Sequence, residues 1–148
     1  MMMRKFNGNI IFILLLAGWI LSGLCKQSEV LAAEQQVLKK EGAIIAISPK
    51  EAQELIKQRE DLLVIDVRTA RERKRAAIAG SIHVPMQDIF QNKTSLKNDQ
   101  PLLLYCAVGG RSSAAAYWLQ KKGFTEIYNL VGGISEWQKQ GLPVVVGK

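Results

Sequence analysis

Short apolar runs alternate with segments of helical periodicity from residue 43 to residue 148. Apolar runs of four or five residues bounded by polar or turn residues predict buried strands, whereas apolar residues spaced three and four apart predict helices with one buried face. A regular alternation of the two is typical of a sheet covered by helices on both faces. The expected strands are residues 43–47, 62–66, 81–84, 101–105 and 127–130.

The segment that follows Ser48 carries the clearest start of a helix. Ser48 suits the N-cap, Pro49 fits the first helical position, and Glu51 completes a capping box. The apolar residues of this helix fall on one face. They are Ala52, Leu55 and Ile56.

Further helices are expected at residues 70–75, 113–122 and 134–140, and Gly132-Gly133 predicts a tight turn into the last of them. Each helix must bury one face against the sheet, which predicts core positions for the large side chains that they carry. These side chains are Tyr117, Trp118, Leu119 and Trp137. The whole pattern predicts a three-layer α/β domain with a mostly parallel five-stranded sheet.

The N-terminal residues have the order of an export signal. Arg4 and Lys5 precede an apolar run over residues 10–24, which is short for a membrane span and is interrupted by glycine and serine. We expect cleavage after Ala33, which follows two other small or apolar residues. The chain then divides into an export signal (1–33), a polar tether (34–42) and a folded domain (43–148). The mature protein is expected in the periplasm or another extracytoplasmic compartment.

Two other fates of this segment stay open. It can remain uncleaved as a single N-terminal membrane anchor, with Arg4 and Lys5 on the cytoplasmic side. Lipidation of Cys25 is the second, although the bulky Leu24 stands where a bacterial lipoprotein signal has a small residue. A membrane contact is therefore expected only if the segment is retained.

The basic balance of the chain belongs mainly to the domain. The net charge is +7, and cleavage after Ala33 would remove three basic residues and one acidic residue, leaving +5. No basic-aromatic stripe accompanies this charge, so nucleic acid is not expected as a partner. Cleavage would also remove Cys25 and leave Cys106 as the only thiol. A single cysteine argues against a disulfide scaffold, a Cys-x-x-Cys redox site and a cysteine-built zinc site.

The candidate chemistry lies at Cys106, which an apolar run delivers to a short loop containing glycine. A lone cysteine at the end of a strand is often only a small buried apolar side chain. Here Gly109 and Gly110 allow successive backbone N–H groups to converge, and Arg111 adds a donor fork that suits oxyanions. These N–H groups and the positive end of the following helix favour thiolate over thiol. We call residues 106–112 the cysteine loop.

The cysteine loop resembles the active-site loop of rhodanese domains, which often reads Cys-x-x-Gly-x-Arg-Ser. Other segments resemble motifs of that family in the same order along the chain. Residues 64–68 resemble its Asp-x-Arg strand, residues 78–85 its Ile-Pro-Gly-Ala-x-x-x-Pro segment, residues 130–137 its Gly-Gly-x-x-x-Trp motif, and residues 141–144 its usual C-terminal finish. The resemblance covers about residues 43–146 and implies a single rhodanese-like domain.

The resemblance implies a sulfurtransferase that needs no metal and no organic cofactor. Cys106 would take the outer sulfur of thiosulfate or a related donor, become a persulfide, and pass the sulfur to a thiophilic acceptor such as cyanide or a thiol. Arg111 would either bind the anion or face inward and brace the loop. The residues expected to bind substrate are Ala107, Val108, Gly109, Gly110, Arg111 and Ser112, and those expected to support the scaffold are Asp66, Arg68 and Glu72.

Several positions depart from the family pattern. Ala76-Ala77 stand where the family usually has Gly-His, Ala79 replaces its proline, and Arg73 stands where an aromatic residue is common. The preference for a donor and an acceptor therefore stays open. The only histidine, His83, is expected to form a hydrogen bond from a strand rather than to act as a general base.

A basic cluster precedes these positions. It is typical of a solvated helix face, and we hypothesise that it attracts small sulfur anions. Its members are Arg71, Arg73, Lys74 and Arg75.

Other functions fit parts of the same pattern. Cysteine phosphatases and arsenate reductases use a thiolate, an N–H cradle and an arginine, but with five residues between cysteine and arginine. Here four residues separate Cys106 from Arg111, and the shorter loop suits a sulfur atom better than a tetrahedral oxyanion. A non-catalytic binding module of the same fold would be expected to lack the cysteine. A persulfide carrier that receives sulfur from a partner protein remains an alternative.

Overall fold

The computed structural model describes residues 42–146. The expected export signal, its cleavage site and nearly all of the tether lie outside these residues. Within residues 42–146, no helix is both long enough and apolar enough to cross a membrane.

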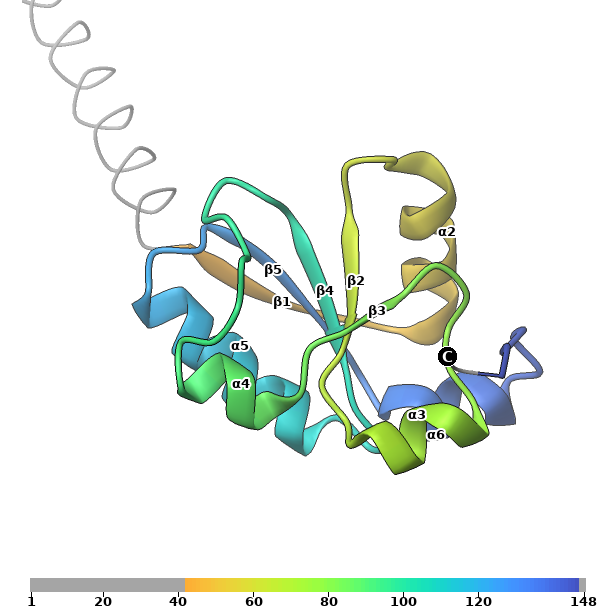
Figure 1. Cartoon of the computed structure of the whole chain (residues 1–148). Coiled ribbons are helices and arrows are strands. Elements are labelled where there is room, and N and C mark those ends of the chain that lie inside the picture. Colours follow the sequence, from red (N-terminus) through yellow and green to blue (C-terminus); the bar gives the residue numbers. More distant parts are fainter. Residues whose placement is uncertain (1–41, 147–148) are drawn as a thin grey trace, which may run out of the picture. The chain divides into compact units, whose positions relative to one another are not determined.

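A single sheet organises the domain and confirms the predicted architecture. Its strands run parallel in the order β1-β5-β4-β2-β3, so that β4 lies in the middle (Figure 1). Each strand lies within one residue or two of its expected range. The strands are β1 (Ala43–Ile47), β2 (Leu63–Asp66), β3 (Ile82–His83), β4 (Leu102–Tyr105) and β5 (Glu126–Leu130).

Helices cover both faces of the sheet. α4 (Met86–Phe90) and α5 (Gly110–Lys121) share one apolar cluster with the sheet, and α2 (Pro49–Gln58) and α6 (Gly133–Lys139) share the other (Figure 1). α3 (Ala70–Arg75) follows β2. The central strand β4 lies between the two helical layers, and it is apolar or aromatic at every position and fully buried. The edge strand β1 is expected to be buried from its apolar sequence, but Ala43, Ile45 and Ala46 are exposed.

Two helices begin with the same local device. At α2, the Ser48 side chain and the Glu51 side chain each bond the backbone of the other, as the sequence predicts. At α3, Thr69 and Glu72 form a second capping box, which the sequence analysis did not identify. Glu72 is thereby fixed at the start of α3.

Two helical features differ from the prediction. α5 begins at Gly110, three residues earlier than expected, because Gly109 already occupies its N-cap in a left-handed conformation. α4 was not predicted, since its five residues are too few to show a helical period. The turn at Gly132-Gly133 is confirmed, because both glycines have positive φ angles of 71° and 57°.

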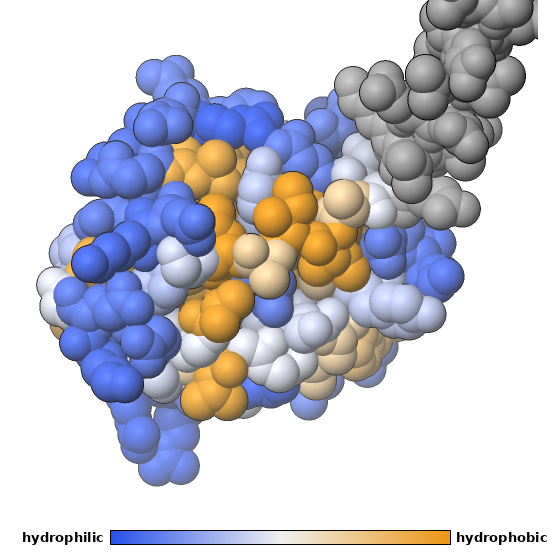
Figure 2. Space-filling view, turned by 180° about the vertical axis from the view of Figure 1, so that it is seen from behind, coloured by the Kyte–Doolittle hydropathy of each residue, from blue (hydrophilic) through white to orange (hydrophobic). Residues whose placement is uncertain are grey.

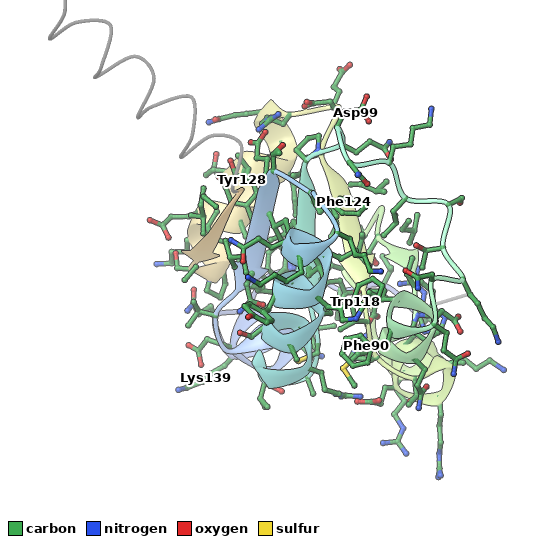
Figure 3. The ribbon with its side chains drawn as sticks, turned by 90° about the vertical axis from the view of Figure 1, so that its left-hand side faces the viewer. Phe90, Asp99, Trp118, Phe124, Tyr128 and Lys139 are labelled. Carbon is green, nitrogen blue, oxygen red and sulfur yellow. The ribbon has the colours of Figure 1, made fainter. Side chains whose placement is uncertain are left out.

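The prediction that Tyr117 lies in the core is wrong, because its side chain is 57% exposed. α5 buries Ala115, Ala116 and Leu119, and Tyr117 points away from that face. Trp137 is buried as expected. Trp118 is half-buried between α4 and α5, with its ring centroid 6.1 Å from that of Phe90 (Figure 3).

A fully buried carboxylate, that of Asp66, ties the end of β2 to its neighbours. It accepts two hydrogen bonds from the Arg68 guanidinium, at 2.8 and 2.6 Å, and one from the Tyr105 hydroxyl at 2.9 Å. Arg73 lies 3.5 Å from the same carboxylate, and its guanidinium donates to the hydroxyl and the carbonyl oxygen of Ser81. A buried carboxylate needs such partners to offset its lost hydration.

Only part of the expected basic cluster on α3 is exposed to solvent. The side chain of Arg73 is only 11% exposed, so its assignment to a solvated helix face is wrong. Arg71, Lys74 and Arg75 remain exposed on α3, and none of them forms a salt bridge with another residue of the described range 42–146.

The surface seen from behind carries an apolar band between hydrophilic margins (Figure 2). A shallow groove beside α2 is lined by Ile47, Leu55 and the polar residues of that helix. It lies on the face of the sheet opposite the apolar cluster that contains Cys106. The groove is therefore separate from the candidate active site.

Candidate active site

Cys106 immediately follows β4, at the carboxyl edge of the sheet. In open parallel sheets, ligands bind beyond the carboxyl ends of the strands, and β4 is the central strand here. The Cys106 side chain is 1% exposed and belongs to the apolar cluster under α4 and α5. The cysteine loop then leads directly into α5.

Donors surround the buried sulfur. The Gly109 N–H donates to Cys106 Sγ at 3.1 Å, and Ser112 Oγ lies 3.6 Å from the same atom. The Ser112 hydroxyl also lies 3.0 Å from the Gly109 carbonyl oxygen, which keeps it inside the loop. The sequence predicts that two glycines, Gly109 and Gly110, shape this loop. Only Gly109 needs its freedom, with φ of 98°, because Gly110 is an ordinary first residue of α5.

These donors decide the ionisation of Cys106. Burial alone would raise the pKa of its thiol. The N–H and hydroxyl of Ser112 and the N–H groups of Val108 and Gly109 more than offset this effect, and they hold the pKa below its ordinary value. A thiolate is the nucleophilic form of cysteine. The geometry therefore supports the expected reactive thiol.

Arg111 is bound by a carboxylate rather than left free for an anion. Its guanidinium donates two hydrogen bonds to Glu72, at 2.9 and 2.5 Å, which joins the start of α5 to the start of α3. Glu72 and, to a smaller extent, the charge of Cys106 raise the pKa of Arg111. Of the two roles left open by the sequence, the bracing role matches this arrangement.

The Glu72 carboxylate accepts hydrogen bonds from Thr69 and Arg111. Arg111 lowers its pKa most, burial opposes this, and the Thr69 hydroxyl and N–H lower it further, giving a pKa of about 2. The side chain expected to support the scaffold is thus ionised across the physiological range. It both caps α3 and holds the arginine of the cysteine loop.

Asp66, Arg68 and His83 form hydrogen bonds with one another or with neighbouring backbone groups, and so support the scaffold. Arg68 donates to the Ala76 carbonyl oxygen at 2.6 Å, and His83 Nε2 lies 2.7 Å from the Arg68 carbonyl oxygen. The hydrogen-bonding role expected for His83 is confirmed. Within residues 42–146, there is no group of three or more His, Cys, Asp or Glu residues placed to hold a metal ion.

One set of contacts at the loop is not predicted from the sequence. The N–H groups of Ile134 and Ser135, in the first turn of α6, donate to the carbonyl oxygens of Cys106 and Ala107 at 2.9 and 3.0 Å. Nothing in the spacing of these segments along the chain signals that they meet. Only the motif Gly132-Gly133 marks the position as unusual.

Comparison with known proteins agrees with this geometry. The model of the family described as "Rhodanese-like domain" matches residues 48–140. The chain belongs to this family. The match includes the cysteine loop, the Asp66–Arg68 pair and the start of α6.

Relatives within the rhodanese-like family support a function of the sulfurtransferase type. A protein named "Sulfurtransferase" from Allochromatium vinosum is 35% identical over 86 residues, which cover 58% of this chain and 80% of that protein. Thiosulfate sulfurtransferase GlpE from Coxiella burnetii is 35% identical over 92 residues, covering 62% and 85%. A rhodanese-related protein from Thermoplasma volcanium superposes with a TM-score of 0.62 at 33% identity, covering 69% of this chain and 98% of that one.

The donors around Cys106 lead to a prediction for Ser112→Ala. Loss of the hydroxyl removes one group that stabilises the thiolate, so the pKa of Cys106 should rise by about one unit. The pH dependence of iodoacetamide alkylation measures this pKa, in a Cys25→Ser background that leaves one thiol. The matched control is Ser113→Ala, at the exposed neighbouring position. Equal pKa values in the two variants would contradict the role of Ser112.

The pair between Glu72 and Arg111 leads to a prediction on pH and stability. The folded-state pKa of Glu72, about 2, lies below the ordinary value of 4.5. Its contribution is therefore complete above about pH 4.5 and is lost as the pH falls toward 2. Urea unfolding should show wild type more stable than Glu72→Gln at pH 7, with the gap narrowing between pH 5 and pH 3. A gap that stays constant over this range would refute the assignment.

Proposed function

We propose that this protein is a sulfurtransferase that carries sulfane sulfur on Cys106. It takes the sulfur from thiosulfate or a related donor and passes it to a thiophilic acceptor such as cyanide or a thiol. The observation that supports this most is the buried Cys106 thiol, whose pKa is lowered by N–H groups of its own loop. Such a site stabilises negative charge on one sulfur atom.

The proposed reaction has two displacement steps. The Cys106 thiolate attacks the outer sulfur of thiosulfate, the S–S bond of the donor breaks, and sulfite leaves with the electron pair. Cys106 then carries a persulfide, whose terminal sulfur is anionic. An acceptor attacks that sulfur, the S–S bond to Cys106 breaks, and the thiolate is restored. Cyanide would give thiocyanate, and a thiol would give a persulfide of the acceptor.

The loop contributes to both steps in the same way. N–H groups aimed at the sulfur stabilise the resting thiolate and, after transfer, the negative persulfide. Ala107, Val108, Gly109 and Gly110 would act through their backbone, and Ser112 through its N–H and hydroxyl. Arg111 would add positive charge while Glu72 holds it in place.

The acceptor is proposed to be external. Cys106 is the only cysteine within residues 42–146, and the other cysteine of the chain, Cys25, lies in the expected export signal. We propose further that the domain works outside the cytoplasm, either released by cleavage or anchored by the N-terminal segment.

Mass spectrometry and a transfer assay test this function together. The purified exported protein should gain one sulfur atom on Cys106 after treatment with thiosulfate, and thiosulfate plus cyanide should yield thiocyanate. The same spectrum gives the mature N-terminus and tests cleavage after Ala33. Cys106→Ser should abolish both the gain of sulfur and the transfer.

Two outcomes separate the alternatives. Turnover of an aryl phosphate or arsenate without thiocyanate would overturn the proposal in favour of a cysteine phosphatase or arsenate reductase. A persulfide that forms only from a persulfidated protein donor, and not from thiosulfate, would favour a persulfide carrier.

The exposed cations of α3 lead to a separate prediction. Arg71, Lys74 and Arg75 form no salt bridge within the described residues, and Glu72 links their helix to the cysteine loop. Replacing all three with Gln should raise the KM for thiosulfate about fivefold at low ionic strength, since charge attracts the anion over a Debye length. It should also flatten the salt dependence of kcat/KM and leave the fold intact.

A charge-matched control tests whether position matters. Lys97, Lys121 and Lys122 are exposed and lie at or near the opposite end of β4 and α5 from Cys106. Their replacement with Gln changes the net charge equally and should leave the KM nearly unchanged. Equal effects of the two triple variants would show that only overall charge matters.

A further inference from the structure

The first turn of α6 has N–H groups with no partner inside the helix. The first intrahelical bond runs from the Glu136 N–H to the Gly132 carbonyl oxygen. The N–H groups before it would be left without an acceptor at most helix starts. Here those of Ile134 and Ser135 donate to the carbonyl oxygens of Cys106 and Ala107, at 2.9 and 3.0 Å. The cysteine loop thus completes the hydrogen bonding of α6.

These bonds determine where the loop N–H groups point. The described residues contain no cis peptide bond, so each carbonyl and the N–H of the next residue point in opposite directions. Fixing the Cys106 and Ala107 carbonyl groups toward α6 turns the N–H groups of Ala107 and Val108 away from it. α6 packs on one face of the sheet, and the Cys106 side chain packs on the other. The N–H groups therefore face the side on which the sulfur lies.

Gly133 allows this close approach. A Cβ atom at this position would lie 2.4 Å from the Cys106 carbonyl oxygen and 2.6 Å from that of Ala107. Any larger residue would push the loop and α6 apart. The helix itself is firmly held, because Trp137 is buried and its indole N–H donates to the Pro143 carbonyl oxygen at 2.9 Å.

We infer that the first turn of α6 positions the cysteine loop: the N–H groups of Ile134 and Ser135 hold the Cys106 and Ala107 carbonyl groups, so that the Val108 N–H, on the opposite side of the second peptide group, faces Cys106 Sγ. The consequence for sulfur transfer rests on the proposed function, whereas the effect on the thiol does not. Ser135 and Gly133 are positioning residues in this arrangement. The Ser135 N–H, the Ala107 carbonyl, the Val108 N–H and the sulfur form one polarised chain.

The sharpest test removes a single N–H group. Ser135 is exposed and lies in the first turn of α6, where proline is tolerated. Ser135→Pro deletes the donor to the Ala107 carbonyl, and Ser135→Ala keeps it. Iodoacetamide alkylation as a function of pH, in the full chain with Cys25→Ser, should show the pKa of Cys106 raised by about one unit in Ser135→Pro and unchanged in Ser135→Ala.

A second pair of variants compares Gly133, at the start of α6, with Gly141, which lies just beyond its end. Gly133→Ala places a Cβ against the loop, whereas Gly141→Ala introduces the same kind of backbone strain at φ of 72° with no heavy atom within 4 Å. Both variants should lose stability in urea, but only Gly133→Ala should raise the pKa of Cys106. Equal pKa values in folded Ser135→Pro, folded Gly133→Ala and wild type would overturn the inference.

A third test needs no substitution in the loop or in α6, so it does not depend on whether such a variant folds. It follows amide proton resonances by NMR in the Cys25→Ser chain. As Cys106 titrates, the amide proton resonances of Val108 and Gly109 should shift. Those of Ile134 and Ser135 should shift with the same midpoint, because the peptide groups of the loop join them to the sulfur. Constant Ile134 and Ser135 resonances through that midpoint would contradict the inference. Because none of these readouts requires thiosulfate, a protein that passes them but forms no persulfide would refute the proposed function alone.

Discussion

A buried thiolate can exist only where hydrogen-bond donors replace the water that it has lost, and this requirement organises the structure around Cys106. The sulfur lies under α4 and α5 in an apolar cluster, which would by itself favour the neutral thiol. The donors come from the backbone of the same loop and from Ser112. Because backbone N–H groups cannot turn independently of their carbonyl groups, the whole loop must be held in one conformation.

The loop is held from both faces of the sheet. On the face covered by α5, Gly109 turns the chain into that helix. On the opposite face, the N–H groups in the first turn of α6 donate to the loop carbonyl groups. Arg111 is braced by Glu72 at the start of α3. Beneath the loop, Asp66 binds Arg68 and Tyr105, the residue before Cys106, and so ties β2 to β4. Three layers of the fold therefore converge on one short segment.

Whether the sequence predicts a feature depends on how far apart along the chain the interacting residues lie. The individual strand segments, the capping box at Ser48 and the loop around Cys106 depend on residues a few positions apart, and each leaves a local pattern. The pairing of Arg111 with Glu72 joins residues 39 positions apart, and the contact of Ser135 with Ala107 is also non-local. Such contacts depend on how elements pack, which no local pattern encodes.

The predictions for the side chains of Tyr117 and Arg73 are wrong for the same reason: tertiary packing, and not residue type or neighbouring residues, decides where each side chain lies. The residue type of Tyr117 predicts a core position, but the alanines of α5 and Leu119 form the buried face. The basic neighbours of Arg73 predict a solvent-exposed side chain, but the buried carboxylate of Asp66 attracts its guanidinium, which also bonds Ser81. With Arg73 and Arg111 both paired with scaffold groups, the main groups that lower the pKa of Cys106 are the backbone N–H groups and the hydroxyl of its own loop. These donors are fixed around one sulfur atom, so they stabilise negative charge there without having to reorient.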